Sequence, residues 1–152
     1  MNALYNLLLH LFAPLALLRL LYKSRQNPAY RRHISERFAR SLPPALPNSL
    51  WVHAVSVGEF IAIRPLLDSL LATHPDLNLW LTCTTPTGRA QIAQYQARHP
   101  QRIIYSYLPY DTVANCRRIL AHIQPRALIL METEIWPNLI RCAAHAGVPV
   151  IL

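Results

Sequence analysis

Five short apolar runs follow one another along residues 50–152, and a stretch with helical spacing separates each run from the next. The runs cover residues 50–55, 77–83, 102–107, 126–131 and 148–152, and the helical stretches cover about 59–73, 87–98, 112–123 and 136–146. Strands that alternate with helices form right-handed βαβ units and lie parallel in a sheet covered on both faces. The sequence therefore predicts an α/β fold with a Rossmann-like, doubly wound sheet.

The part of the chain before the first run differs in character. Pro28 can start a helix, a basic stretch over 29–40 predicts a short one, and a proline-rich connector over 41–47 marks a domain boundary. We therefore expect three segments: 1–26, a hydrophobic membrane anchor with a basic flank; 27–47, the basic helix and connector; and 48–152, the Rossmann-like domain. The last run reaches the final residue without a closing helix, so we expect this domain to be truncated at its C-terminal end.

Residues 4–22 are largely apolar, and this length is close to that of a helix that crosses a bilayer. Asn6, His10, Pro14 and Arg19 interrupt the stretch. There is no charged segment before it and no small-residue cleavage site after it, which argues against a removable signal peptide. The sequence predicts an uncleaved anchor or a helix lying in the membrane interface. The structural alternative is an amphipathic helix packed on the domain.

Basic residues are concentrated beside this apolar stretch. Residues 1–47 hold seven basic side chains and one acidic one, a net charge of +6 out of +8 for the whole chain. Basic residues that follow an apolar segment directly place the rest of the chain in the cytoplasm. A basic excess in this position favours anionic membrane lipids over nucleic acid, because a nucleic-acid reader usually spreads its basic residues over a folded face.

The three cysteines, Cys83, Cys116 and Cys142, are odd in number and have no spacing typical of a zinc site. They lie within or beside apolar runs. We expect them to be small core residues in a reducing compartment.

Ligands of open parallel sheets bind at the carboxyl ends of the strands, so the strand-to-helix turns are the places to search for a site. The first turn is Ser56-Val-Gly-Glu59. Gly58 has no Cβ, which allows a tight turn and a close approach by substrate. Glu59 falls in the first helical turn, where a carboxylate is favoured, and it could accept a proton from a sugar hydroxyl. The structural alternative is that Glu59 is only a good first-turn residue.

The second turn, Thr84-Thr-Pro-Thr-Gly88, offers hydroxyls and backbone N–H groups to an anionic or polyhydroxyl ligand. Thr87 as an ordinary N-cap is the alternative. A glycine fingerprint and a P-loop lysine are both missing, which disfavours a nucleotide-dependent oxidoreductase. In the third turn, Leu108-Pro-Tyr-Asp111, we expect Asp111 to cap the helix that follows.

The fourth turn, Met131-Glu-Thr-Glu-Ile-Trp-Pro-Asn138, carries two carboxylates at the end of a buried strand. A buried carboxylate is unfavourable unless it is hydrogen-bonded or functional. Trp136 is suited to form the wall of a site, and Pro137 is suited to start a helix. The alternative is a solvated turn.

These turns, taken together, resemble the N-terminal half of the 3-deoxy-D-manno-octulosonic acid (Kdo) transferases of lipopolysaccharide synthesis. The matching stretches are Pro28-Ala-Tyr-Arg31, Glu36-Arg-Phe38, His53-Ala-Val-Ser-Val-Gly-Glu59, Thr84-Thr-Pro-Thr-Gly88, Leu108-Pro-Tyr-Asp111 and Glu132-Thr-Glu-Ile-Trp-Pro-Asn138. The resemblance implies a GT-B glycosyltransferase, with two Rossmann-like domains facing each other across a cleft. It implies that the N-terminal domain receives the lipid A precursor and the C-terminal domain binds CMP-Kdo, with no catalytic metal or cofactor, on the cytoplasmic face of the inner membrane.

The resemblance also implies roles for individual residues. Glu59 matches the general base and Glu132 matches a second acidic residue of the active site. The lining of the acceptor site would include Ser56, Gly58, Thr85 and Thr87. The basic run Arg31, Arg32, Arg37 and Arg40 would meet acceptor phosphates or the bilayer, because arginine binds phosphate bidentately.

Two departures from the family pattern stand out. Ala39 replaces the glycine that commonly follows Glu-Arg-Phe, and the donor domain is absent from the chain. We therefore expect this chain alone to be inactive. The non-enzymatic alternative is a membrane-anchored module that binds lipid A without catalysis. The number of Kdo units transferred is left open, because the family includes mono- and multifunctional members.

Overall fold

The predicted strands form a parallel sheet in the computed structural model, which describes residues 2–131 and 135–152. The strands are β1 Ser49–His53, β2 Asn78–Cys83, β3 Ile103–Tyr107, β4 Ala127–Leu130 and β5 Val150–Ile151. Their order, β3-β2-β1-β4-β5, reverses direction between β1 and β4. A crevice opens at such a topological switch point at the carboxyl ends of the strands, and this is the usual ligand position in doubly wound sheets. The predicted α/β architecture is confirmed.

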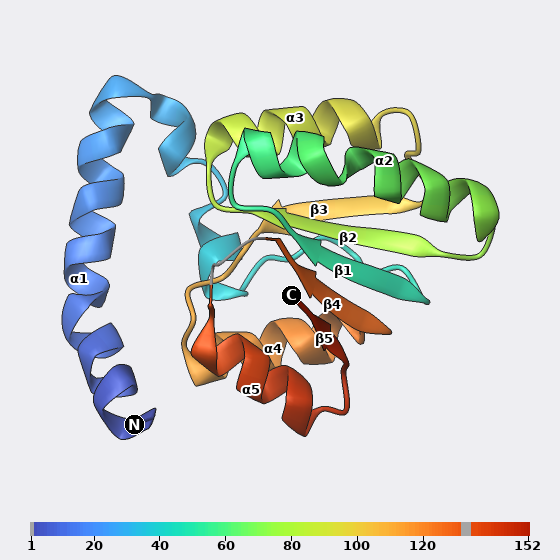
Figure 1. Cartoon of the computed structure of the whole chain (residues 1–152). Helices are drawn as coiled ribbons and strands as arrows, with labels where there is room; N and C mark the ends of the chain where they lie inside the picture. The colour runs from blue at the N-terminus through green and yellow to red at the C-terminus, as the bar shows by residue number, and fades with distance from the viewer. Residues whose placement is uncertain (1, 132–134) are drawn as a thin grey trace.

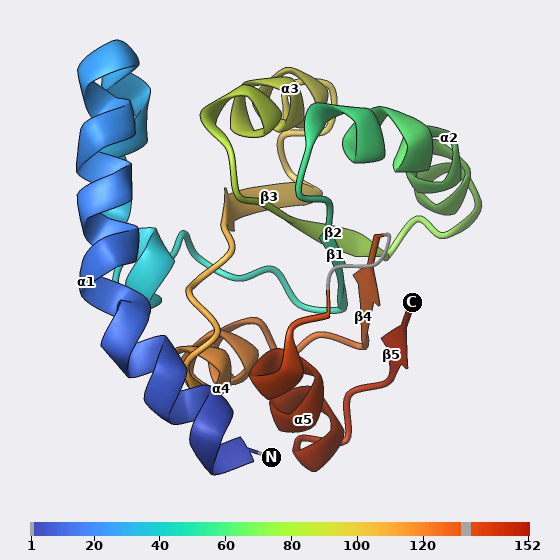
Figure 2. The same ribbon diagram turned by 60° about the vertical axis from the view of Figure 1, so that its left-hand side comes forward.

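Two pairs of helices cover the two faces of the sheet. The helices are α2 Val57–Thr73, α3 Pro86–Gln96, α4 Val113–Ile123 and α5 Pro137–His145. In both views α2 and α3 lie on one face, and α4 and α5 lie on the other (Figure 1 and Figure 2). Each of these strands and helices begins and ends within two residues of its predicted position, because strand and helix periodicity are local properties of the sequence.

Hydroxyl side chains start three of these helices. Ser56, Thr85 and Thr112 are the N-caps of α2, α3 and α4, and each accepts a hydrogen bond from the backbone N–H three residues later. The alternative that Thr87 caps α3 is wrong. Thr85 takes that place because Pro86, which has no N–H to lose, fits the first helical position.

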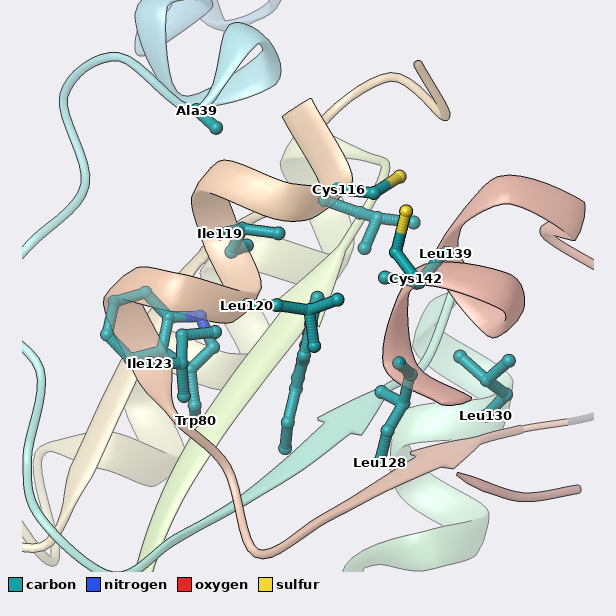
Figure 3. Close-up of a cluster of buried hydrophobic side chains, with 13 residues drawn as sticks. Ala39, Trp80, Cys116, Ile119, Leu120, Ile123, Leu128, Leu130, Leu139 and Cys142 are labelled. Carbon is teal, nitrogen blue, oxygen red and sulfur yellow. The ribbon is translucent and has the colours of Figure 1, made fainter. Parts of the chain in front are cut away.

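Two hydrophobic clusters of described residues lie on the two faces of the sheet. Trp80 is fully buried on the side of α4 and α5 (Figure 3), and Trp51 belongs to the same cluster. Val52 and Leu79 pack on the side of α2 and α3. Adjacent strand residues point to opposite faces, so strands covered on both sides must be almost wholly apolar. The prediction that the cysteines are core residues is confirmed, since all three are buried and unpaired: Cys83, Cys116 and Cys142.

The N-terminal segment runs beside these layers. Its elements are α1 Asn2–Gln26 and two short 3-10 helices, η1 Pro28–Arg31 and η2 Ile34–Phe38. The prediction of a single helix over 29–40 is wrong. Arg32 is extended and His33 adopts a left-handed conformation with φ of 56°, so the backbone leaves the helical path between the two turns.

The proline-rich connector lies against the core. Leu42 and Ala45 pack on the hydrophobic cluster beneath α4, and the His122 imidazole Nε2 lies 2.8 Å from the Pro43 carbonyl. The placement of a domain boundary at residues 41–47 stays a prediction.

α1 is attached to the domain near its N-terminus and to the 3-10 helix η1 near its C-terminus. Near its N-terminus the Tyr5 hydroxyl donates to Asp111 Oδ2 at 2.8 Å, and Asn138 Nδ2 donates to Asn6 Oδ1 at 2.7 Å. Near its C-terminus Leu20 is buried. The opposite side of α1 exposes large apolar side chains: Leu4, Leu7, Leu8, Leu11, Phe12, Leu15, Leu18, Leu21 and Tyr22. Among the described residues, no helix has both the length and the apolar character needed to cross a membrane.

Candidate functional site

The turns singled out in the sequence meet at the carboxyl edge of the sheet. The Ala54 N–H donates to the Thr82 carbonyl at 3.0 Å, and the Thr84 hydroxyl donates to the Val55 carbonyl at 3.3 Å. On the other side of β1, the Met131 N–H donates to the His53 carbonyl at 3.0 Å. These bonds tie the ends of β1, β2 and β4 into one surface at the topological switch point.

The Glu59 carboxylate is held by groups of its own turn. Val55 N–H donates to Oε2 at 2.8 Å and the Ser56 hydroxyl donates to Oε1 at 3.0 Å, while Ser56 Oγ accepts from the Glu59 N–H at 3.3 Å. This reciprocal arrangement is a variant of the capping box, in which the carboxylate reaches the N–H preceding the N-cap residue. The structure therefore gives Glu59 a definite structural role. Glu59 is only partly buried, and each carboxylate oxygen has a further lone pair, so it can still accept a proton.

Gly58 leaves open space in front of this turn. It is exposed, and a Cβ built on it would meet only Ser56 Oγ among the described atoms, at 3.8 Å. Nothing in the packing of the turn requires a glycine there. The absence of a side chain leaves room for a ligand beside Glu59.

Gly88 in the second turn is a different case. It is buried, and a Cβ would lie 3.0 Å from Thr85 Oγ1 and 3.4 Å from Cys83 Cβ. Thr85 Oγ1 is itself occupied, since it accepts from the Gly88 N–H at 3.1 Å and from the Thr87 hydroxyl at 3.3 Å. Gly88 therefore serves internal packing, and Thr87 is the exposed hydroxyl of this turn.

A buried ion pair stands behind the second turn. The Arg89 guanidinium donates to both Glu36 oxygens, at 2.6 and 3.0 Å, and the Tyr107 N–H donates to Glu36 Oε2 at 2.8 Å. Arg37 donates to the Thr84 carbonyl at 3.0 Å and its guanidinium lies 3.9 Å from the centre of the Tyr107 ring. Bidentate arginine–carboxylate pairs are strong and directional, so they fasten η2 to α3 and to the end of β3.

Reasoning from the sequence missed the pairing of Glu36 with Arg89. A signal was present, because Glu36 is the single acidic residue in the strongly basic segment 1–47. A lone carboxylate in such surroundings is a candidate for a buried, paired position.

Asp111 caps a helix, but not the one expected. Its carboxylate accepts from the Asn138 N–H at 3.0 Å and from the Leu139 N–H at 2.8 Å, in the first turn of α5. The prediction that Asp111 caps α4 is wrong, since Thr112 does so. Trp136, the N-cap residue of α5, has no side-chain cap of its own, so this role falls to Asp111. Burial, followed by the hydrogen bond to Asp111, raises the pKa of Tyr5 and keeps its hydroxyl protonated as a donor.

The fourth turn is described only in part. Glu132 and its neighbours up to residue 134 lie outside the described residues. Pro137 occupies the first turn of α5, which confirms the predicted helix start. His53, the last residue of β1, is fully buried, and the Trp136 ring lies edge-on to its imidazole with 5.9 Å between the ring centres.

The structure gathers some predicted site residues and leaves others apart. Ser56, Gly58, Glu59 and Thr85 belong to two neighbouring turns at the carboxyl edge. Arg31, Arg32 and Arg40 are exposed on the N-terminal segment, outside these turns. The prediction that Arg37 meets phosphate or the bilayer is wrong, because its side chain is buried against the Tyr107 ring. The Arg31 Nε–H donates to Ser24 Oγ of α1 at 2.6 Å.

The chain is similar in sequence to proteins of one known family. Residues 32–152 match the family model described as 3-deoxy-D-manno-octulosonic-acid transferase (kdotransferase). The chain is 35% identical over 152 residues to the 3-deoxy-D-manno-octulosonic acid transferase of Haemophilus influenzae. It is 38% identical over 154 residues to the enzyme of that name from Bordetella pertussis, and 32% identical over 148 residues to a probable mitochondrial one from Arabidopsis thaliana.

These alignments cover 97% of this chain in each case. They cover 34%, 36% and 32% of the three relatives, respectively. The chain thus spans about a third of the length of the curated relatives it matches.

Proposed function

The chain belongs to the Kdo transferase family, and we propose that it forms the acceptor side of a GT-B glycosyltransferase that moves Kdo from CMP-Kdo to the lipid A precursor. The observation that carries this proposal is the turn at the end of β1, where the Glu59 carboxylate is fixed beside the open space at Gly58. This turn lies at the edge where doubly wound sheets bind their ligands.

In the proposed reaction Glu59 is the general base. Val55 and Ser56 fix the two carboxylate oxygens, and the positive end of the α2 dipole stabilises the negative charge. A carboxylate held in this way can take the proton of the acceptor sugar hydroxyl as that oxygen attacks the anomeric carbon of CMP-Kdo, whose bond to the phosphate breaks so that CMP leaves. Glu132 is proposed as the second acidic residue of the same site.

The acceptor headgroup is proposed to lie over the two turns. Gly58 allows the sugar to come close to the backbone, and the hydroxyls of Ser56, Thr85 and Thr87 line the path. Two exposed guanidinium groups near the C-terminal end of α1, those of Arg31 and Arg32, are proposed to meet acceptor or lipid phosphates.

We propose that α1 lies in the surface of the inner membrane, on its cytoplasmic face. Its free side carries the nine exposed apolar residues named above, with exposed fractions of 41 to 66%. Basic side chains near its C-terminal end are exposed as well: Lys23, Arg25, Arg31 and Arg32. Each basic residue close to an anionic leaflet contributes about 1 kcal/mol of binding, so this end supports a surface orientation.

A second candidate function is binding of lipid A without catalysis. The capping role of the Glu59 carboxylate favours it, because that role explains the residue without any reaction. Both candidates place the acceptor at the same turns. They differ in whether the proton-accepting capacity of Glu59 is used.

A Kdo-transfer assay separates the two. It uses the chain alone and the chain joined to the C-terminal domain of a relative, each with and without Glu59→Gln. Glutamine keeps an oxygen for the Val55 N–H, so the turn should fold, and the loss of a general base should lower transfer by the joined form about 10²- to 10⁴-fold. We expect no transfer by the chain alone, whose donor site is proposed to lie in the added domain.

Full transfer by the joined form after this substitution would remove Glu59 as the base. Thr112→Ala is the matched control, because it removes the N-cap hydroxyl of α4, which the proposed reaction does not use. It should lower stability by about 1 kcal/mol and reduce transfer far less than Glu59→Gln does.

A further inference from the structure

Two buried polar atoms without hydrogen-bond partners lie on neighbouring rings. Within residues 2–131 and 135–152, His53 Nε2 and Trp136 Nε1 are inaccessible to solvent and unpaired. The rings meet at an interplanar angle of 81°. His53 ends β1 and Trp136 directly precedes α5, so the pair lies at the β1/β4 switch point. Buried polar atoms are rarely left unpaired, so this pair needs an explanation.

The hydrogen-bonding state of His53 follows from its other nitrogen. Nδ1 lies 3.1 Å from the Thr82 carbonyl oxygen and 3.0 Å from Thr82 Oγ1. A carbonyl only accepts, so Nδ1 carries the hydrogen. Burial lowers the pKa of His53 to about 4, so the ring is neutral near pH 7. Nε2 therefore presents a bare lone pair, an acceptor, on a ring that neighbours the unpaired donor of Trp136.

The other two tryptophans show that an unpaired indole is unusual in this chain. Trp51 Nε1 donates to Thr82 Oγ1 at 2.9 Å, and Trp80 Nε1 donates to Ser106 Oγ at 3.2 Å. Each of these indoles has a hydroxyl partner supplied by a neighbouring strand. Trp136 lies instead at the carboxyl edge, where none of the described residues supplies a partner for its N–H.

The chemistry of the pair selects the missing partner. The group must accept from an N–H and donate to a nitrogen lone pair. A carboxylate can accept but has no hydrogen for Nε2, and an ammonium can donate but cannot accept from the indole. A hydroxyl group does both, and a water molecule has the same capacity.

We propose that His53 Nε2 and Trp136 Nε1 together bind one hydroxyl group of the acceptor sugar. The proposal rests on the proposed function, and it adds a polar subsite on the α5 side of the switch point. The indole must move to admit the hydroxyl.

Nuclear magnetic resonance of the ¹⁵N-labelled chain tests this subsite directly. The three indole N–H signals are followed while the lipid A headgroup, freed of its acyl chains, is added, and Trp136→Phe identifies the signal of Trp136. We expect the Trp136 signal to shift with the ligand, while those of Trp51 and Trp80 stay in place. The amide signal of Gly58 reports headgroup binding independently.

The two reporters separate failure of the subsite from failure of the proposed function. A shift at Gly58 without one at Trp136 means that the pair takes only water, which overturns the subsite and leaves acceptor binding intact. No shift at either position, at any headgroup concentration up to solubility, overturns the proposed function and the subsite with it.

Substitutions at His53 give a second, matched test. In His53→Asn the amide nitrogen can replace Nδ1 as donor to Thr82, but no atom replaces Nε2. In His53→Gln the longer amide can reach the Nε2 position. We expect Asn to weaken headgroup affinity about three- to tenfold, the effect of losing one hydrogen bond, and Gln to recover part of it.

Trp136→Phe should weaken the affinity to a similar degree, because it removes the indole donor and keeps an aromatic ring. Affinities are read from the Gly58 amide shift. Unchanged affinity in either His53→Asn or Trp136→Phe, with the chain folded, would overturn the subsite. If His53→Asn does not fold, Trp136→Phe carries the test.

Discussion

The β1–α2 turn and the β2–α3 turn are built on one plan. Each begins with a hydroxyl N-cap residue whose oxygen accepts the N–H three positions later, Ser56 from Glu59 and Thr85 from Gly88. Each also contains one of the chain's three glycines, Gly58 or Gly88. The turns are neighbours, since the hydroxyl of Thr84 bonds the carbonyl of Val55.

Gly58 and Gly88 have different structural roles. Gly88 is enclosed by Thr85 and Cys83, and the turn around it is backed by the ion pair of Glu36 and Arg89. Gly58 faces open space. The β2–α3 turn is therefore closed and supports the fold, whereas the β1–α2 turn is open at the ligand edge. Three substitutions test this division, and a change of pH tests the strand end from which the open turn starts.

The largest effect on stability is expected from breaking the ion pair of Glu36 and Arg89, which supports the closed turn. Glu36→Ala leaves the guanidinium of Arg89 without its carboxylate in a mostly buried position, which should lower the free energy of unfolding by about 3–5 kcal/mol. Urea denaturation measures the change. Glu59→Ala, in the open turn, is the control and should lower stability by only about 1 kcal/mol. Equal losses in the two variants would contradict the division between the turns.

The second-largest effect on stability is expected from low pH, acting through His53 at the end of β1. The pKa of His53 is lowered from 6.5 to about 4 by burial, so between these values the unfolded chain binds more protons than the folded one. Stability should therefore be complete above pH 6.5 and fall as the pH drops toward 4, by on the order of 3 kcal/mol from this residue. Denaturation at a series of pH values, compared with His53→Gln, isolates the contribution. Parallel pH profiles for the two chains would show that His53 is not buried as a neutral ring.

A methyl group in the closed turn should have a smaller effect. Gly88→Ala places Cβ 3.0 Å from Thr85 Oγ1, so the capping hydroxyl must move. Overpacking of this kind lowers stability by about 1–3 kcal/mol, and the higher helix propensity of alanine offsets up to about 1 kcal/mol of that. Thermal unfolding followed by circular dichroism checks it. A variant as stable as the unchanged chain would mean that the turn is not closed.

The smallest effect on stability is expected in the open turn. Gly58→Ala should leave stability unchanged or raise it by up to about 1 kcal/mol, because the added methyl meets only Ser56 Oγ at 3.8 Å and alanine favours the helix. Acceptor binding should weaken, because the methyl occupies the space proposed for the sugar. Titration with the lipid A headgroup measures this, and unchanged affinity would show that the acceptor does not approach the turn there.

Much of the fold follows from the sequence, because the features that specify it are local. Apolar runs, helical spacing and turn residues predict each strand and each of α2 to α5 to within two residues. The basic segment departs from its local preference, since Glu36 is drawn to Arg89 and to the Tyr107 N–H, 53 and 71 positions away. The capping of α5 by Asp111, 27 positions before Asn138, is equally invisible to a local pattern.

The candidate site follows from the sequence in part. The position of Glu59 in the first turn of α2 is confirmed, whereas its bond to the Val55 N–H needs the folded turn. Gly58 and Gly88 look alike in sequence. Only the atoms around them in the folded chain show that Gly88 is tightly packed and that Gly58 faces open space. The unpaired nitrogens of His53 and Trp136 depend on what their neighbours supply, which no spacing rule describes.

The carboxylate of Asp111 bonds α1 and α5 at once, through Tyr5 and through the N–H groups of Asn138 and Leu139. With α1 in the membrane surface, as proposed, this junction fixes the distance and the orientation of the rest of the domain relative to the bilayer. The distance from the bilayer to the proposed acceptor sugar position is then a property of the fold. A lipid substrate would then keep its chains in the membrane while its headgroup reaches the turn that carries Glu59, at a fixed distance from the bilayer.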